Sequence, residues 1–198
     1  MTDASTPSAD RLAAILAFLD EANRLKDTLR SGRTPEGRQE STAEHSWRLC
    51  LLAILLSDEL KGVDMLKLVK LCIVHDLGEA ISGDVPAVDQ RAGDDRAARE
   101  RADLVTLCAP LPADLSAEMV ALWDDYAAAA SPEAVMAKGL DKIETMLTHS
   151  TGRNGNDFDY RFNLGYGLEA TGRHPLLAAL RAPIDARHRA ILERRAAD

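Results

Sequence analysis

The sequence predicts an all-α protein folded as a single-domain helical bundle. Its 198 residues suffice for one domain with a sizeable buried core. Ala and Leu are abundant while aromatic residues make up only 4%, and this composition favours helices over sheets. The chain also lacks the long Val, Ile and Thr alternation of a β-sandwich. We therefore expect a loose N-terminal tail over residues 1–9 and one helical domain over residues 10–198.

The first half of the chain is expected to hold three helices. Residues 10–29 form the first, because four apolar residues recur on one face: Leu12, Ile15, Leu16 and Leu19. Residues 31–39 contain two Gly and one Pro and should form a loop. The second helix starts after Ser41, since Ser41 and Glu44 match a capping box. The apolar stripe of this helix places His45 on its inward face.

The third helix is expected to begin after Asp64 and to run into His75 and Asp76. Residues 68–74 are nearly all apolar, so a short buried strand is the alternative, but their Leu and Lys content favours the helix. Gly and Pro then break the pattern after residue 82, which places Asp84 in a turn.

The second half alternates helices with short linkers. Residues 131–133 read Ser-Pro-Glu and combine three signals of a helix start, for a helix that reaches about His149 and carries Asp141. The other expected elements are helices over about 90–107, 116–130, 160–170 and 175–195, and a loop over 152–157.

The bulk properties exclude some partners. The net charge is −8 and the pI is near 5.2, whereas a nucleic acid polymer requires a strongly basic surface. A small phosphate ester remains suitable, because a cation and a few arginines can reverse the field inside one pocket. Cys50, Cys72 and Cys108 lack metal-site spacing and fit free thiols of a reducing cytoplasm. No membrane association is expected, because the longest apolar run, residues 49–56, is too short to span a bilayer.

Two histidines and two carboxylates form a pattern that suits one divalent metal ion. His45 and His75 lie on expected apolar helix faces, Asp76 directly follows His75, and Asp141 comes later. Hydrolytic metal sites combine imidazole with carboxylate and leave positions for water. A neutral histidine on an apolar face is also a common core residue, so the residues alone leave both interpretations open. Burial of Asp76 without a cation or hydrogen bonds is costly, which favours the metal.

Two segments surround these residues, 38–46 (RQESTAEHS) and 75–86 (HDLGEAISGDVP), and Asp141 follows them. Together they resemble the HD-domain superfamily of metal-dependent phosphohydrolases, and within it the 5′-deoxynucleotidase branch. The resemblance implies an HD-type bundle that holds one divalent ion through His45, His75, Asp76 and Asp141. Such a ligand set accepts Mn, Co, Fe, Ni or Zn. Members with two metals carry extra histidines before the last Asp, and here no His lies between His75 and His149. The histidines outside the motif are expected to be surface or structural residues: His149, His174 and His188.

The resemblance also implies roles for three more residues. Glu79 positions or activates the attacking water and Asp84 protonates the leaving 5′-oxygen, although these two roles are exchangeable. Arg30 contacts the phosphate through its forked guanidinium. Without the resemblance, these residues are a solvated helix acid, a turn residue and a solvated loop arginine. The enzymes it resembles carry a Trp directly after this Arg, whereas this chain has Ser31, so nucleoside recognition is not carried over.

The implied function is a phosphomonoesterase that releases phosphate from 5′-deoxynucleotides. The alternatives are a nucleotide or alarmone pyrophosphohydrolase and a non-catalytic metal-binding helical module. We expect a homodimer, with Trp47 in the core. Half of the aromatic residues form a late cluster, expected to pack a terminal helix or a dimer contact, with base stacking as the alternative: Phe158, Tyr160, Phe162 and Tyr166.

Overall fold

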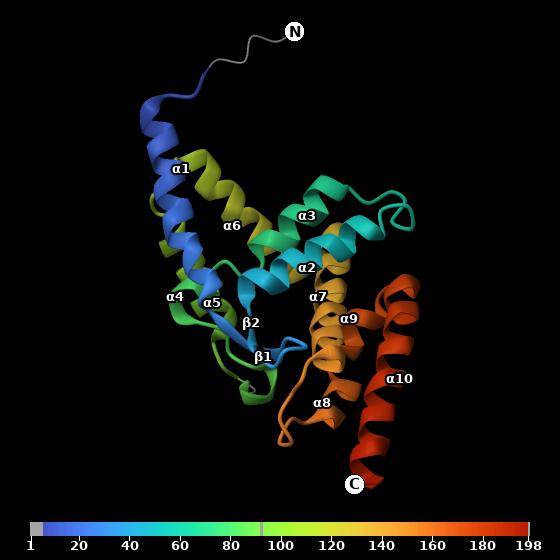
Figure 1. Cartoon of the computed structure of the whole chain (residues 1–198). Helices are drawn as coiled ribbons and strands as arrows, with labels where there is room; N and C mark the ends of the chain where they lie inside the picture. The colour runs from blue at the N-terminus through green and yellow to red at the C-terminus, as the bar shows by residue number, and fades with distance from the viewer. Residues whose placement is uncertain (1–5, 92, 198) are drawn as a thin grey trace.

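The computed structural model describes residues 6–91 and 93–197, so most of the expected tail over residues 1–9 lies outside the described residues. Within them the chain forms a helical bundle with a small two-stranded hairpin, which confirms the predicted all-α class (Figure 1). Helix α1 begins at Ala9, one residue before the expected start of the domain. No helix in this described part is both long and apolar enough to cross a membrane.

Helix α7 (Pro132–Thr151) lies at the centre of the bundle. Helices α2 (Thr42–Leu55), α3 (Met65–Val74) and α10 (Pro175–Ala197) pack against it (Figure 1). The apolar core between these helices includes side chains with no solvent exposure: Leu49, Leu68, Leu71, Leu140 and Leu177. Burial on several sides of α7 brings polar residues of this helix into the interior as well.

Local capping signals set the starts of the three helices that carry the motif. Ser41 precedes α2 and forms the expected capping box with Glu44. Asp64 and Ser131 each accept a hydrogen bond from the backbone N–H three residues later, at the starts of α3 and α7. The predicted starts of these helices are therefore confirmed, and residues 68–74 are helical rather than extended.

The first helix is shorter than expected, and its predicted inner face is wrong. Helix α1 spans Ala9–Ala22 and is followed by the 3₁₀ turn η1 (Asn23–Lys26), so the helix does not reach Leu29. The buried side chains of this segment are Phe18 and Leu25. Three of the four expected inner residues are 44–62% exposed: Leu12, Leu16 and Leu19. Apolar spacing located the helix, but the packing of Phe18 decided which side faces the core.

Residues 31–39, expected as a loop, contribute to a β-hairpin. Strand β1 (Leu29–Arg33) pairs antiparallel with strand β2 (Gln39–Ser41). The hairpin packs on α7 at Gly32, where a Cβ atom would lie 2.7 Å from the Thr148 side chain. A residue without a side chain is therefore required at this contact. The contact joins residues far apart in the sequence, which explains why local turn signals did not predict the strands.

The remaining elements differ from expectation mainly at their ends. Helices α5 and α6 begin at Arg96 and Ala113 instead of about 90 and 116. The helix expected over 160–170 is split at Gly167, which has a φ of +65° and lies against Lys142. The bounds are α4 Glu79–Ser82, η2 Ala87–Asp89, α5 Arg96–Leu107, α6 Ala113–Ala128, α8 Tyr160–Gly165 and α9 Leu168–Gly172.

Trp47 is not a core residue, contrary to expectation. It is 63% exposed on α2, on the face opposite the buried Leu49. Three further apolar residues of α2 share that outer face: Leu51, Ile54 and Leu55. The outer faces of α1 and α2 are therefore both apolar.

Candidate metal centre and active site

The four expected ligands converge where α2, α3 and α7 meet. Asp76 Oδ2 lies 3.0 Å from His75 Nε2 and 3.7 Å from His45 Nε2. Asp141 Oδ1 lies 3.3 Å from His45 Nε2 and 4.0 Å from His75 Nε2. Atoms that each lie about 2.1 Å from one ion are themselves about 3–4 Å apart. His45, His75 and Asp76 therefore lie at the mutual spacing of ligands to one cation, and Asp141 lies within 4.0 Å of both imidazole nitrogens.

Both imidazoles direct an unsatisfied nitrogen into this space. His45 Nε2 and His75 Nε2 are buried and lack a hydrogen-bond partner among the described residues. A buried polar atom without a partner is costly, and a cation bound to both nitrogens removes that cost. Imidazole nitrogen combined with carboxylate oxygen suits divalent ions from Mn to Zn. The chemistry of the donor set therefore fits a mononuclear metal site.

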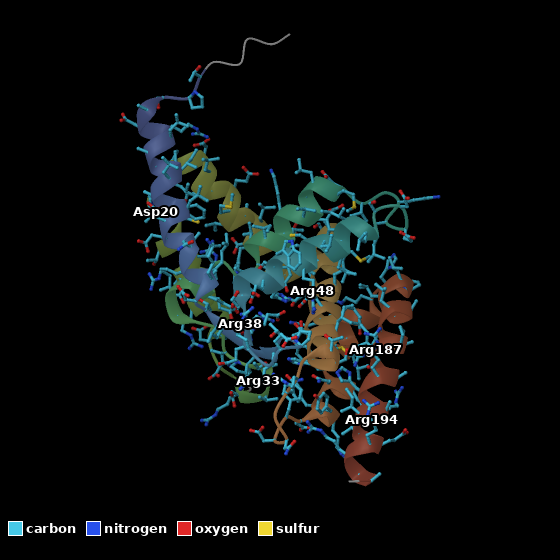
Figure 2. The ribbon with its side chains drawn as sticks, viewed as in Figure 1. Asp20, Arg33, Arg38, Arg48, Arg187 and Arg194 are labelled. Atoms are coloured by element: carbon cyan, nitrogen blue, oxygen red, sulfur yellow. The ribbon has the colours of Figure 1, made fainter. Side chains whose placement is uncertain are left out.

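The other ring nitrogen orients each histidine. His75 Nδ1 donates to the Cys72 carbonyl at 2.9 Å. His45 Nδ1 donates to Oε2 of Glu144, a carboxylate that is 1% exposed. Glu144 Oε1 accepts a hydrogen bond from Arg48 Nε at 2.6 Å, and Figure 2 shows Arg48 on α2. These contacts fix the tautomer that leaves Nε2 free to bind a metal.

Asp141 is held through its other carboxylate oxygen. The Tyr126 hydroxyl and the Lys142 ammonium donate to Asp141 Oδ2 at 2.8 and 2.9 Å, which leaves Oδ1 toward the histidines. The sequence analysis assigned no role to Tyr126 or Lys142. Lys142 is adjacent to Asp141 along the chain, but Tyr126 comes from α6, and no sequence signal links it to the site.

Arg30, the expected phosphate contact, lies at the same centre on strand β1. Its guanidinium donates to Asp76 Oδ2 at 3.0 Å and to Thr145 Oγ1 at 3.3 Å. The side chain is 12% exposed and lines the same cavity as His75, Asp76 and Asp141. Only two of its five donors are used in these bonds, so the others can meet phosphate oxygens.

Glu79 and Asp84 line the same cavity. The chain turns between α3 and α4, so Asp76 and Glu79 do not share one continuous helix. Burial and the charge of Asp76 raise the pKa of Glu79 to about 9, and Thr42 Oγ1 donates to Glu79 Oε2 at 2.9 Å. Burial also raises the pKa of Asp84, against the opposing charge of Arg30. Carboxyls with raised pKa values in a cleft suit proton transfer.

The cavity has a volume of about 550 Å³ and is lined by His75, Asp76 and Asp141 and by residues of α8, whereas His45 is fully buried. Five of the eight aromatic residues line it: Trp123, Tyr126, Phe158, Phe162 and Tyr166. The late aromatic cluster therefore divides, because Tyr160 is buried and packs against Arg195 of α10. His149, expected as a surface or structural residue, lines the cavity too, whereas His188 is fully buried.

Comparisons with known proteins identify similar sequences and a similar fold. A family model described as HD domain matches residues 22–180. The human 5′-deoxynucleotidase HDDC2 is 31% identical over 148 residues, covering 74% of this chain and 72% of that protein. The Dictyostelium discoideum 5′-deoxynucleotidase HDDC2 is 25% identical over 177 residues, covering 83% and 93%. The crystal structure of a predicted metal-dependent phosphohydrolase from Magnetospirillum magnetotacticum matches with a TM-score of 0.67 at 26% identity, covering 94% and 93%.

Proposed function

The chain belongs to the HD-domain family and is a metal-dependent phosphohydrolase, and from this premise we propose that it releases phosphate from 5′-deoxynucleoside monophosphates. The observation that carries the proposal is the convergence of two unpartnered imidazole nitrogens and two carboxylates beside Arg30. The names of the relatives support the substrate class. We propose one divalent ion per chain, drawn from Mn, Fe, Co, Ni and Zn.

In the proposed site, the ion is held by the four side chains His45, His75, Asp76 and Asp141. When bound, it supplies positive charge for the phosphoryl oxygens and acidifies water. Arg30 adds a second positive group, whose forked donors match two oxygens of one phosphate. The hydrogen bond from Arg30 to Asp76 keeps the guanidinium beside the ligands, so that it need not be reoriented when phosphate binds.

We assign Glu79 to the attacking water and Asp84 to the leaving oxygen. Glu79, held by Thr42, accepts the proton that water loses as its oxygen bonds to phosphorus. Positive charge held at the ligands would lower the raised pKa of Glu79, which favours the carboxylate form that accepts a proton. Asp84 donates a proton to the 5′-oxygen as the P–O bond breaks, giving a nucleoside and orthophosphate.

We further propose a homodimer that forms through the exposed apolar faces of α1 and α2. The supporting side chains are 40–71% exposed: Leu12, Leu16, Leu19, Trp47, Leu51, Ile54 and Leu55. Apolar surface on two helices of one chain is typical of an interaction site. For the compartment we propose a reducing cytoplasm, because the three cysteines are buried and free.

The proposal is tested by assaying orthophosphate and pyrophosphate release from deoxynucleoside monophosphates and from nucleoside triphosphates, with added Co²⁺ or Mn²⁺. We expect orthophosphate from the monophosphates, with losses of at least about 100-fold in Glu79→Gln and Asp84→Asn. Glu100→Gln is the matched control, because Glu100 lines the cavity but has no assigned role. Pyrophosphate as the product, or no turnover of any nucleotide, would contradict the proposal.

A further inference from the structure

The cavity extends well beyond the space that a metal ion and a phosphate require. Its volume of about 550 Å³ falls within the range of sites for whole small-molecule ligands, about 300–1,000 Å³. Three of the expected ligands, His75, Asp76 and Asp141, line one end. The other end is lined by residues of α8 and by the segments before α8 and after α4, which Figure 1 shows on the two sides of the hairpin. A ligand anchored by its phosphate therefore extends its remaining part toward α8.

An aromatic wall lines this second end. Phe158 precedes α8, Phe162 lies within this helix, and Tyr166 directly follows its last residue. All three are only partly buried, unlike the neighbouring Tyr160, whose ring is covered by the core. Aromatic residues are 4% of the chain, so their concentration at one cavity is not explained by composition. The segment after α4 contributes Val85 and Val88, so the second end is apolar on that side as well.

Contacts between rings hold the wall in place. The Phe158 ring packs edge-on against His149, with centroids 4.8 Å apart, and the Phe162 ring lies 5.6 Å from that of Tyr166 at a 30° tilt. Tyr166 is already engaged by Lys142, whose ammonium lies 5.2 Å from its ring centroid. The two phenylalanines therefore offer preorganised ring surface that lacks a charged partner in the described residues.

We propose that Phe158 and Phe162 form the subsite for the nucleobase of the substrate, which they bind by stacking. A planar heterocycle matches an apolar aromatic wall, and every nucleobase has a face that can stack on it. This inference rests on the proposed function, because the subsite binds the part of a nucleotide substrate that the phosphate site does not contact. It assigns recognition of the nucleoside to α8 and the residues just before it.

The test compares two ligands that share a sugar phosphate and differ in the base: deoxyadenosine 5′-monophosphate and deoxyribose 5-phosphate. Binding is measured by calorimetry and hydrolysis by phosphate release, in wild type, Phe158→Leu and Phe162→Leu. Phe18→Leu is the matched control, since Phe18 is the remaining phenylalanine and packs from α1 into the core, away from the cavity lining. We expect wild type to prefer the nucleotide by about 5- to 150-fold. Each cavity variant should lose most of this preference through KM while its kcat stays near wild type.

The outcomes separate the subsite from the proposed function. Equal binding of the two ligands by wild type, or the same loss of preference in Phe18→Leu, overturns the subsite even when nucleotides are hydrolysed. Base-dependent binding that disappears in Phe162→Leu, with no hydrolysis by any form, supports the subsite and overturns the proposed function. A variant that weakens both ligands equally shows that the phenylalanine supports the fold or the phosphate site, and this overturns the stacking role.

Discussion

Replacing Glu144 with Gln is expected to weaken metal binding while the protein remains folded. Glu144 lies on α7 and uses both carboxylate oxygens, one for His45 Nδ1 and one for Arg48 Nε. Gln has nearly the same shape, but one of its two terminal atoms is an NH₂ group that donates. This NH₂ group must face either the imidazole N–H or the guanidinium N–H. Two donors then point at each other, and one of the two hydrogen bonds of Glu144 is lost. The His45 ring then loses the contact that fixes its tautomer.

The size of the effect follows from the position of Glu144. The carboxylate is 1% exposed, so water cannot replace the lost hydrogen bond. Removing the partner that orients a metal-binding histidine typically lowers metal affinity about 10- to 100-fold, which corresponds to about 1.4–2.7 kcal/mol. We expect the Kd for Mn²⁺ or Co²⁺ to rise by this factor in Glu144→Gln.

The assay is calorimetric titration of the metal-free protein, with circular dichroism to confirm folding. Glu133→Gln is the control: it changes the same residue type on the same helix, about 16 Å farther along its axis, where Glu133 accepts a hydrogen bond from the Asp64 N–H. It should change thermal stability but not the metal Kd. A folded Glu144→Gln protein with a Kd within twofold of wild type would refute the positioning role of Glu144.

Three further perturbations test other parts of the account. Arg30→Ala should lower kcat/KM by about 100-fold, chiefly because the substrate phosphate loses a charged hydrogen-bond donor. An equal loss of metal affinity would instead show that the variant acts by disturbing the ligand Asp76, to which Arg30 donates a hydrogen bond. Burial lowers the pKa of His149 to about 4, below its value of 6.5 when unfolded, so the unfolded chain takes up this proton first as the pH falls. The contribution of neutral His149 to the free energy of unfolding is therefore lost as the pH falls below about 6.5. This free energy should decrease by about 2 kcal/mol between pH 7 and pH 5 on account of His149. Urea unfolding of the metal-free protein should show a smaller decrease in His149→Gln, and an unchanged decrease contradicts the assignment. Trp47→Glu should convert a dimer to a monomer in light scattering, whereas a wild-type monomer removes the proposed interface.

The fold was predictable where short-range chemistry sets it. Ser41, Asp64 and Ser131 each cap a helix through a backbone group three residues away, so nearby residues contain the whole signal. The β-hairpin was missed because its packing depends on the contact between Gly32 and α7, more than 100 residues away. Solvent exposure of Leu16 and Trp47 was missed for a related reason: periodicity shows that a face is apolar, but not what covers it.

The site shows the same division. The paired motif segments and Asp141 located all four candidate ligands, because each segment carries its own residue pattern. The groups that orient these ligands were not predicted. Tyr126 reaches Asp141 from α6, and a lone Tyr carries no local sign of its partner. Glu144 is the exception that was accessible, because it follows Asp141 by three residues and so lies on the same face of α7.

The claim that one cation is held by these four side chains is tested most directly by metal content. Protein equilibrated with Mn²⁺ or Co²⁺ and then freed of unbound ion is analysed by mass spectrometry, for wild type and for His75→Ala and Asp141→Ala. One ion per wild-type chain, and almost none in either folded variant, is the result we predict. Full metal content in both variants, or two ions in the wild type, would contradict the account.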